Sequence, residues 1–244
     1  MTAPGYRARL YRAYLSTHFE NYRPATPESL ERDRRLFRAL YRRFLPRSRD
    51  AEILEVGCGT GSFLAFLKDE GYRHVRGIDA GEEQVALARR LGVDTAEVAD
   101  AMPYLAAHRE QYDFLAALDV IEHFTKDEVL EFLDLAHGAL RPGGRLLLRT
   151  PNADSPFHSW IRYADFSHEV TFSPRSITQV LRVAQFSGVE VYPLEPYAHG
   201  LASAGRRLLW LGIKQLIHLY LLVEQGTAGS GVFTSNLCAV AEKR

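Results

Sequence analysis

Cysteine is scarce in this 244-residue sequence, which contains only Cys58 and Cys238. Two cysteines cannot form the disulfide framework of a small secreted protein, and Cys58 lies inside a glycine-rich loop. We therefore expect a reducing, cytoplasmic compartment. The basic residues near Met1 are not followed by an apolar h-region, so no signal peptide is expected. The most apolar segment, residues 205–223, is too short and too interrupted to predict a transmembrane span.

The sequence also lacks net charge, with 30 Lys and Arg residues against 30 Asp and Glu residues. This balance, and the lack of an appended nucleic-acid-binding module, lead us to expect no DNA partner and to rank RNA low. The charge is uneven, however, because residues 1–50 contain 12 arginines and only 5 acidic residues. This segment could face a phosphate, an anionic sugar or a membrane surface. It could equally be a solvated helical face that pairs with acidic residues of the main domain.

Two common nucleotide-binding signatures are missing as well. The apolar run that ends at Val56 is followed by glycines at positions 57, 59 and 61, which is neither G-x-G-x-x-G nor a phosphate loop with Gly-Lys-Ser/Thr. The pattern predicts a buried strand, a tight loop and a helix that begins near Ser62. The glycines permit positive φ angles and let a ligand lie against the main chain. Free N–H groups at the start of the helix favour a polar or negative group on that ligand.

Apolar strands alternate with helical segments over the rest of the chain, and the turns between them are short. We expect strands at residues 53–56, 75–79, 94–98, 112–118, 145–150, 188–194 and 232–241. A turn is predicted at residues 141–144, and irregular chain between residues 151 and 173. The alternation predicts an α/β fold, a Rossmann-like doubly wound sheet of seven mostly parallel strands. Ligands of such sheets bind at the carboxyl ends of the strands, where we expect Gly57, Asp79, Asp100, Asp119 and Thr150.

The chain divides into an N-terminal helical cap, residues 1–48, and a main domain, residues 49–244. Within the cap, Thr26 or Pro27 begins a predicted helix that continues to about Leu45. A helical insertion, residues 197–230, precedes the last strand and contains the apolar segment. We therefore expect one large domain with helical additions near both ends.

The glycine loop is also the part of the sequence that resembles a known family. Residues 55–61 read E-V-G-C-G-T-G, which resembles motif I of the class I S-adenosylmethionine (SAM)-dependent methyltransferases. The resemblance implies SAM as cofactor and places Asp79 on its ribose hydroxyls, which suit a carboxylate. Asp100 would accept a hydrogen bond from the adenine amine, although it could also cap the next helix. The implied cofactor-binding residues are Glu55, Gly57, Gly59, Gly61, Asp79, Asp100, Ala101, Met102 and Leu118.

N-terminal helices often cover the SAM pocket in that family. The resemblance therefore suggests that ring-bearing residues of the cap line a lid over the cofactor. Packing in the core is the alternative explanation for each of them. They are Tyr11, Tyr14, His18 and Tyr22.

A second group of polar residues follows the fourth strand. If a helical turn begins just after Leu118, Asp119 and Glu122 share a face and His123 lies on nearly the same side. Together with His168, these side chains would suit Mg²⁺, Mn²⁺ or Zn²⁺, and an ion bound there would lower the pKa of a substrate hydroxyl. Without a metal, His168 could act as a general base, while Glu122 caps the helix and His123 packs against SAM or the sheet. These last two roles would be purely structural; our hypothesis is instead that Glu122, His123 and His168 carry the chemistry, either through a metal or through a histidine base.

The same segment resembles two methyltransferase families. Asp-Val-Ile-Glu-His at residues 119–123 is similar to the Glu-x-x-Glu-His metal segment of the small-RNA 2′-O-methyltransferases. Thr-Pro-Asn at 150–152 and Asp-Phe-Ser-His at 165–168 are similar to their downstream motifs. A Glu-His segment also occurs in the ubiquinone-biosynthesis O-methyltransferases, which are metal-assisted. This sequence departs from the pattern at Asp119, which is shorter than the Glu expected there.

The complete arrangement is similar to bacterial methyltransferases of polysaccharide, lipopolysaccharide and glycolipid assembly. They share the Thr-Pro-Asn turn, a downstream Asp-x-x-His and a late apolar helix. This resemblance makes a sugar hydroxyl, free or in a glycolipid, the first expected acceptor. A small phenolic or quinone-like molecule is second, RNA ribose is third, and a protein that binds SAM without transferring its methyl group is a further alternative. The apolar helix could touch a lipid-linked substrate at a membrane surface, form a homodimer contact or pack on the core.

Overall fold

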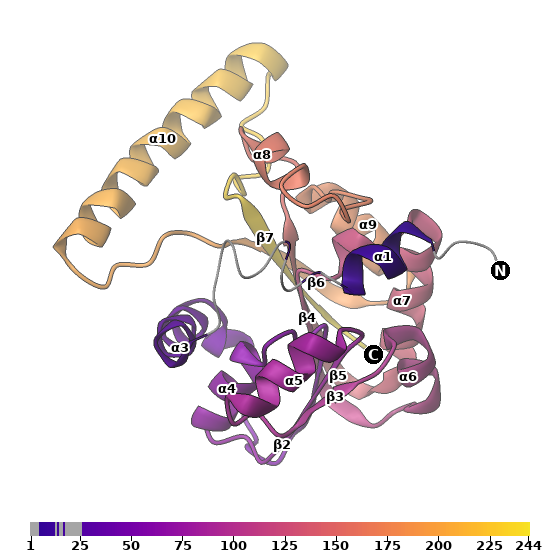
Figure 1. Ribbon diagram of the computed structural model, residues 1–244. Coiled ribbons are helices and arrows are strands. Elements are labelled where there is room, and N and C mark those ends of the chain that lie inside the picture. The colour runs from indigo at the N-terminus through magenta and orange to yellow at the C-terminus, as the bar shows by residue number, and fades with distance from the viewer. Residues whose placement is uncertain (1–4, 13, 15–16, 18–25) are drawn as a thin grey trace.

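The computed structural model describes residues 5–12, 14, 17 and 26–244. Its strands are β1 (Glu52–Val56), β2 (His74–Asp79), β3 (Ala96–Val98), β4 (Tyr112–Leu118), β5 (Leu140–Pro151), β6 (Ser187–Pro193) and β7 (Asn236–Glu242). They form one seven-stranded sheet in the order β3-β2-β1-β4-β5-β7-β6 (Figure 1). Strands β1 to β5 run parallel, and β7 runs antiparallel to both β5 and β6. The predicted fold class is therefore confirmed.

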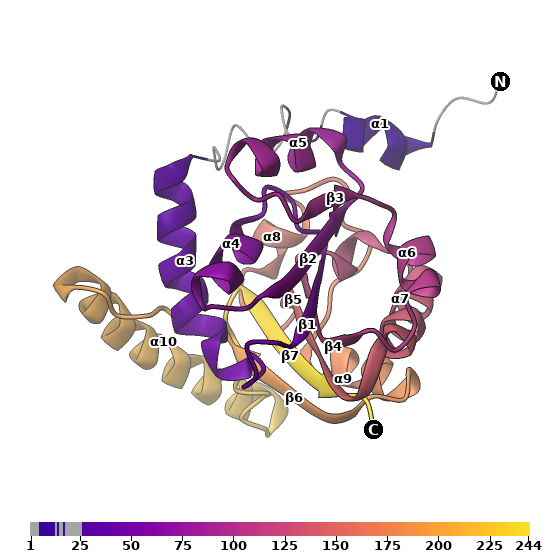
Figure 2. The same cartoon turned by 90° about the horizontal axis from the view of Figure 1, so that it is seen from below.

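Helices cover both faces of the sheet, as a doubly wound fold requires. They are α1 (Tyr6–Arg12), α3 (Pro27–Tyr41), α4 (Ser62–Asp69), α5 (Glu82–Arg90), α6 (Ala101–Ala107), α7 (Lys126–Ala139), α8 (His158–Arg162), α9 (Pro174–Val183) and α10 (Leu201–Gln225). Figure 2 shows α3 and α4 on one side of the sheet, and α6, α7 and α9 on the other. Each side has its own buried cluster, one containing Phe37 and Phe63 and the other containing Phe132 and Ile177.

The helix α3 begins where the sequence predicted. Thr26 is its N-cap, because its side chain accepts a hydrogen bond from the Ser29 amide at 3.2 Å. The helix ends at Tyr41, and a 3₁₀ turn at Arg42–Phe44 leads on to Leu45. Phe37 and Tyr41 are buried, and the Phe37 ring meets that of Phe63 in α4 edge-on at 5.3 Å between centroids. This helix thus contributes to the core of the main domain, while the domain boundary at residue 48 stays a prediction.

Three local expectations about the second half of the chain are wrong. The turn expected at residues 141–144 is part of β5, because Gly143 donates to the Lys243 carbonyl and Gly144 accepts from the Lys243 amide. The segment expected to be irregular contains the short helix α8. The last strand starts at Asn236 instead of Val232. In the first case the strand conformation depends on a partner about a hundred residues away, which no local pattern could reveal.

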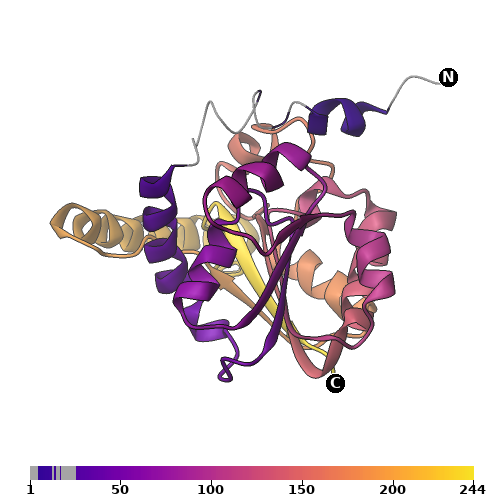
Figure 3. The ribbon, with the colours of Figure 1, turned by 60° about the horizontal axis from the view of Figure 1, so that its bottom comes forward.

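The predicted insertion before the last strand contains one long helix, α10. It covers the apolar segment expected at residues 205–223 and extends beyond it at both ends. Figure 3 shows it reaching sideways past α3. Ser203 is the only residue of α10 that is buried. In the described part of the chain, no helix is long and apolar enough to cross a membrane.

Candidate active site

The glycine loop between β1 and α4 has the predicted backbone. Gly57, Gly59 and Gly61 have φ angles of 70°, 51° and 79°. Residues other than glycine rarely adopt this region of φ. A Cβ at Gly57 would lie 2.3 Å from a methyl of Val120, and one at Gly61 would lie 2.9 Å from a methyl of Val93. At Gly59 nothing lies within 4 Å. The outer two glycines therefore allow close packing, and the middle one leaves open space where a ligand can approach the backbone.

Asp79, at the carboxyl end of β2, lies directly against this loop. Its two oxygens accept hydrogen bonds from the amides of Gly59 and Gly81, both at 2.8 Å. Burial raises the pKa of Asp79 above its ordinary value, although these two donors oppose the rise. Because each carboxylate oxygen can accept a second hydrogen bond, the pair remains suited to the two hydroxyls of a ribose.

Asp100 caps α6, as one of its two expected roles requires. Its side chain accepts from the Met102 amide at 3.1 Å, so residues 101 and 102 form the first turn of that helix. Leu118 is the last residue of β4 and is buried at the same edge of the sheet. The contacts of Asp100, Ala101, Met102 and Leu118 with an adenine-bearing cofactor stay predictions.

Glu55 is buried beneath the glycine loop and is only 3 % exposed. Burial raises the pKa of Glu55 well above its ordinary range, although the Arg149 guanidinium opposes the rise. Its Oε2 atom has no hydrogen-bond partner in the described part of the chain. A buried polar atom without a partner is costly, so this oxygen fits a site that a polar ligand completes.

Asp119 is not among the ligand atoms that the structure brings together, so its assignment as a metal ligand stays a prediction without structural support. The residue has a φ of 59°, and the next turn, a 3₁₀ helix at Ile121–His123, begins after it. Its carboxylate instead accepts two hydrogen bonds from Arg149 at the end of β5, one of them at 2.7 Å from Nε. The predicted i, i+3 geometry does not form because the helical turn begins only after Asp119, whose carboxylate forms a two-pronged ion pair with Arg149.

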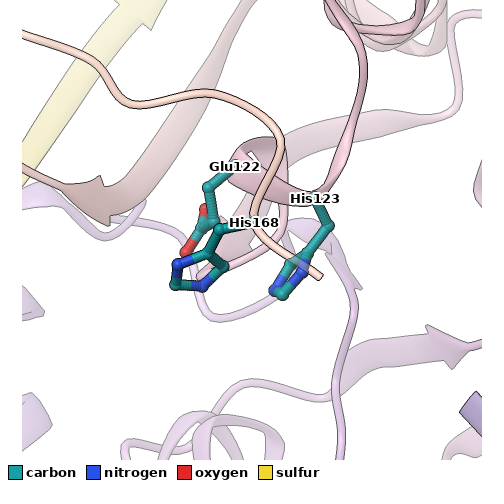
Figure 4. Close-up of side chains that lie close together, drawn as sticks. All are labelled: Glu122, His123 and His168. Atoms are coloured by element: carbon teal, nitrogen blue, oxygen red, sulfur yellow. The ribbon is translucent and has the colours of Figure 1, made fainter. Parts of the chain in front are cut away.

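Glu122, His123 and His168 do come together (Figure 4), and one ligand atom from each lies within 4.8 Å of the others. His168 reaches the cluster because the Glu122 carbonyl accepts hydrogen bonds from the amides of Glu169 and Val170. The Glu122 side chain is buried, and Thr150 donates to its Oε2 at 3.0 Å. Its Oε1 has no partner in the described part of the chain. Burial, reinforced by the Asp119 carboxylate, raises the pKa of Glu122 well above its ordinary range.

Hydrogen bonds fix the orientation of the His123 ring. Its Nδ1 lies 2.8 Å from the Ser167 hydroxyl, which itself donates to Asp165 at 2.6 Å. Because the hydroxyl proton is directed at Asp165, His123 donates through Nδ1 and keeps the lone pair on Nε2. Tyr14 donates to the other oxygen of Asp165 at 2.5 Å. Burial, with a smaller effect of His168, lowers the pKa of His123 to about 4, so its ring is neutral at pH 7.

The second imidazole is held in the same way. His168 Nδ1 lies 3.3 Å from the Arg162 carbonyl in α8, which can only accept, so Nδ1 carries the proton and Nε2 is free. Burial lowers the pKa of His168, against the opposing charge of Asp165. Two neutral rings therefore present Nε2 lone pairs beside a buried carboxyl group, which suits either a divalent cation or a proton acceptor.

The helix α1 and Tyr14 contact segments that form this site. Arg7 of α1 pairs with Glu128 at 2.6 Å and with Glu169 at 3.7 Å. Burial is the main reason why the pKa of Tyr11 rises to about 12, and the charges of Asp165 and Asp79 contribute to it. Tyr11 therefore lies within electrostatic reach of both the loop carboxylate and the histidine cluster. The other two residues of the expected lid, His18 and Tyr22, lie outside the described residues.

Three residues of this arrangement had no role assigned from the sequence. Ser167 links His123 to Asp165, Arg162 orients His168, and Arg149 binds Asp119. Ser167 lies inside the Asp-Phe-Ser-His segment, so its position near His168 was visible, but its contact with a residue 44 positions earlier was not. Nothing in the sequence singled out the two arginines.

Comparison with known proteins agrees with this geometry. The family described as "Methyltransferase domain" matches residues 29–191. The ubiquinone biosynthesis O-methyltransferase of Aeromonas salmonicida is 30 % identical over 105 residues, 41 % of this chain and 43 % of the relative. The enzyme of the same name from Paramagnetospirillum magneticum is 34 % identical over 103 residues, 41 % of this chain and 40 % of the relative. The matched segment thus spans less than half the length of either relative.

Solved structures share the fold at lower identity. A SAM-dependent methyltransferase from Archaeoglobus fulgidus superposes with a TM-score of 0.67 and 19 % identity, covering 92 % of this chain and 97 % of that one. A phosphoethanolamine N-methyltransferase from Haemonchus contortus, in complex with SAM, has a TM-score of 0.62 and 16 % identity over 96 % of this chain and 60 % of that one. The family match covers well over half of the chain and coincides with the glycine loop, the strand-end carboxylates and the sheet order. The chain therefore belongs to the methyltransferase-domain family and has the class I SAM-dependent methyltransferase fold.

Proposed function

We propose that this protein transfers the methyl group of SAM to a hydroxyl group, with Glu122, His123 and His168 at the acceptor oxygen. The observation that supports this most directly is the convergence of their ligand atoms within 4.8 Å. Glu122 and His123 follow β4, and Thr150 near the end of β5 donates to Glu122, while the glycine loop follows the neighbouring strand β1. A donor bound on the loop would therefore have its reactive end close to the cluster.

The sulfonium of SAM already activates the methyl group, so the chain must align a nucleophile, exclude water and accept a proton. In the proposed step the hydroxyl oxygen bonds to the methyl carbon as the carbon–sulfur bond breaks, which leaves a neutral thioether. The hydroxyl proton passes to the Nε2 of His168 or His123 and from there to solvent. Because both rings are neutral at pH 7, they can accept it. Tyr11 and Tyr14 would help to exclude water above the site.

The same donor set also fits a divalent cation. Two Nε2 atoms with their Nδ1 partners fixed, and a Glu122 oxygen without a partner, are a typical arrangement for Mn²⁺ or Zn²⁺ and acceptable to Mg²⁺. When bound there, such an ion would lower the pKa of the acceptor hydroxyl. Thr150 holds the Glu122 carboxyl group in place for either role.

A small aromatic hydroxyl compound is the acceptor that we favour. The named curated relatives of this chain include ubiquinone biosynthesis O-methyltransferases, which supports this class better than the sugar expected from the sequence. The segment that carries His168 also exposes four aromatic side chains at every third position, each 77–83 % exposed: Phe157, Trp160, Tyr163 and Phe166. Such rings offer flat surfaces for stacking an aromatic acceptor. They would also stack on sugar rings, so a sugar hydroxyl is the second candidate.

The test is a transfer assay with methyl-labelled SAM. Catechols, hydroquinones, sugars, glycolipids and short RNA are each offered as acceptor, after chelator treatment and after add-back of Mg²⁺, Mn²⁺ or Zn²⁺. We expect label on a catechol or hydroquinone and full rates only after add-back. Full rates in chelator, with metal removal verified, would rule out a role for a metal and would support a histidine ring as the proton acceptor. Label on RNA alone would overturn our choice of acceptor, and SAM binding without transfer to any acceptor would overturn the proposed activity.

A further inference from the structure

The helix α10 has an apolar face that nothing in the described part of the chain covers. One narrow side of the helix, at Trp210, Lys214 and Leu221, is half-buried against the body, where Lys214 pairs with Glu195 at 2.7 Å. The opposite side carries large apolar residues that are 57–80 % exposed: Leu208, Leu209, Leu216, Leu219 and Val223. Figure 1 shows the helix standing apart from the layers around the sheet. An exposed apolar surface of this length indicates an interaction site.

The two glycines of α10 lie on that same apolar face. Gly205 and Gly212 are seven positions apart, which is nearly two helical turns, so both point the same way as Leu216 and Val223. A Cβ at either glycine would have nothing within 4 Å. The backbone is therefore bare where a second helix would need to approach closely.

The charges on α10 indicate which helix would fit. Arg206 and Glu224 are exposed, and neither pairs with an opposite charge in the described part of the chain. They are 18 residues apart, which is five turns, so they lie on the same edge of the apolar face about 27 Å apart. They cannot reach each other within one helix. In two antiparallel copies of the helix, however, Arg206 of each copy would meet Glu224 of the other.

We propose that α10 is the interface of a homodimer in which the helices of two copies of this chain pack antiparallel across a twofold axis near Gln215. Gln215 lies midway between Arg206 and Glu224, and its exposed amide can hydrogen-bond its counterpart at the axis. A twofold interface must be complementary to itself, and this surface meets that condition in shape and in charge. The inference does not depend on which acceptor the protein methylates.

A second copy of this chain fits the surface better than a lipid bilayer does. Helices that lie on a membrane usually carry Lys and Arg along the side opposite the apolar face. In α10 that opposite side packs on the protein, and its Lys214 is already paired with Glu195. Only Arg206 and Arg207, both at one end, remain to face anionic lipid.

Charge exchange on the full-length protein tests the proposal by sedimentation velocity. We expect the wild type to be a dimer. Arg206→Glu and Glu224→Arg should each weaken dimerisation roughly tenfold at low salt, since each replaces two ion pairs by two like-charge contacts. An equimolar mixture of the two variants should recover the wild-type affinity as a heterodimer, because every 206–224 contact is then attractive. The double variant should recover it as well.

Two further variants test the apolar face itself. Leu216→Glu places a charge at its centre and should give a monomer, whereas Val183→Glu, on an exposed site of α9, should leave the dimer unchanged. Circular dichroism and SAM binding show that each variant is folded. A wild type that is monomeric at all concentrations would overturn the proposal, as would charge variants that dimerise like the wild type. Wild-type protein that binds anionic phospholipid vesicles without self-associating would identify a lipid surface instead, and would equally overturn it.

Discussion

The two halves of the proposed active site are built from different parts of the protein. The half that we expect to bind the cofactor, the cofactor half, consists of the glycine loop, Asp79 and Asp100, which lie at the carboxyl ends of β1, β2 and β3 and are held mainly by backbone amides. The half that we propose for the acceptor, the acceptor half, consists of Glu122, His123 and His168, which are held by side chains and carbonyls from several separate segments. One half is thus fixed by local backbone geometry and the other by contacts between distant residues.

This difference has a physical reason. A ligand that is the same in every reaction can be bound by backbone groups, whose positions follow from strand ends and glycine φ angles. The acceptor and its proton need side chains with set tautomers and suitable pKa values. Those depend on burial and on partners such as Ser167 and Arg162. Substitutions should therefore separate the two halves, one affecting SAM binding and the other affecting turnover.

The largest effect is expected in the acceptor half, for His168→Ala. This change removes a proton acceptor and a metal ligand at once, so kcat should fall by roughly 10²- to 10⁴-fold. SAM affinity, measured by calorimetry, should stay within about twofold of wild type. His158→Ala, at an exposed histidine of α8, is the matched control and should leave both values unchanged. Near-normal turnover in His168→Ala would remove both the base and the metal version of the proposal.

In the cofactor half, Asp79→Asn should act in the opposite way. The amide has one acceptor oxygen where the carboxylate has two, and it lacks the charge, so it cannot bind two hydroxyls and two backbone amides together. We expect SAM affinity to fall by about 10- to 100-fold, with kcat at saturating SAM much less affected. Asp94→Asn, in the loop just before β3, provides the control. Unchanged affinity in Asp79→Asn would show that the ribose is bound elsewhere.

The same contrast explains what the sequence could predict. The spacing of Gly57, Gly59 and Gly61 restricts the backbone locally, so the strand, the loop and the start of α4 were all predictable from it. Parallel strands bring their carboxyl ends together, which put Asp79 near the loop before any contact was known. The caps at Thr26 and Asp100 are likewise local and came out as expected.

The acceptor half could be predicted only in part. Helical spacing grouped Asp119 with Glu122 and His123, and the resemblance added His168, but the structure brings together only Glu122, His123 and His168. The Asp119 carboxylate is bound by Arg149, 30 residues later, which spacing cannot reveal. The contacts that orient the histidines are also long-range. Ser167 lies 44 residues from His123, and Tyr14 lies 151 residues from Asp165.

The smallest effect is expected from the ion pair between Arg7 of α1 and Glu128 of α7, which holds α1 on the main domain. Burial would raise the pKa of Glu128, but hydrogen bonds from Arg7 and Thr125 outweigh it and the pKa is lowered. A lowered folded-state pKa means that this stabilisation is complete above the unfolded value of about 4.3 and is lost as the pH falls through the folded value. Since the pair is partly exposed, it should contribute only about 0.5 kcal/mol, a change of roughly twofold in how often α1 opens.

Hydrogen exchange of residues 5–12 measures this opening directly. With intrinsic rates corrected for pH, protection should be constant from pH 7 to about 5 and should fall as the solution becomes more acidic. Arg7→Gln at pH 7 should already show the reduced protection and should lose the pH dependence, whereas Arg9→Gln, at an exposed position of the same helix, should behave like the wild type. Because Tyr11 lies near both Asp79 and Asp165, opening of α1 should expose the two halves together. Reduced protection that leaves transfer rates unchanged would mean that α1 covers the site without contributing to it.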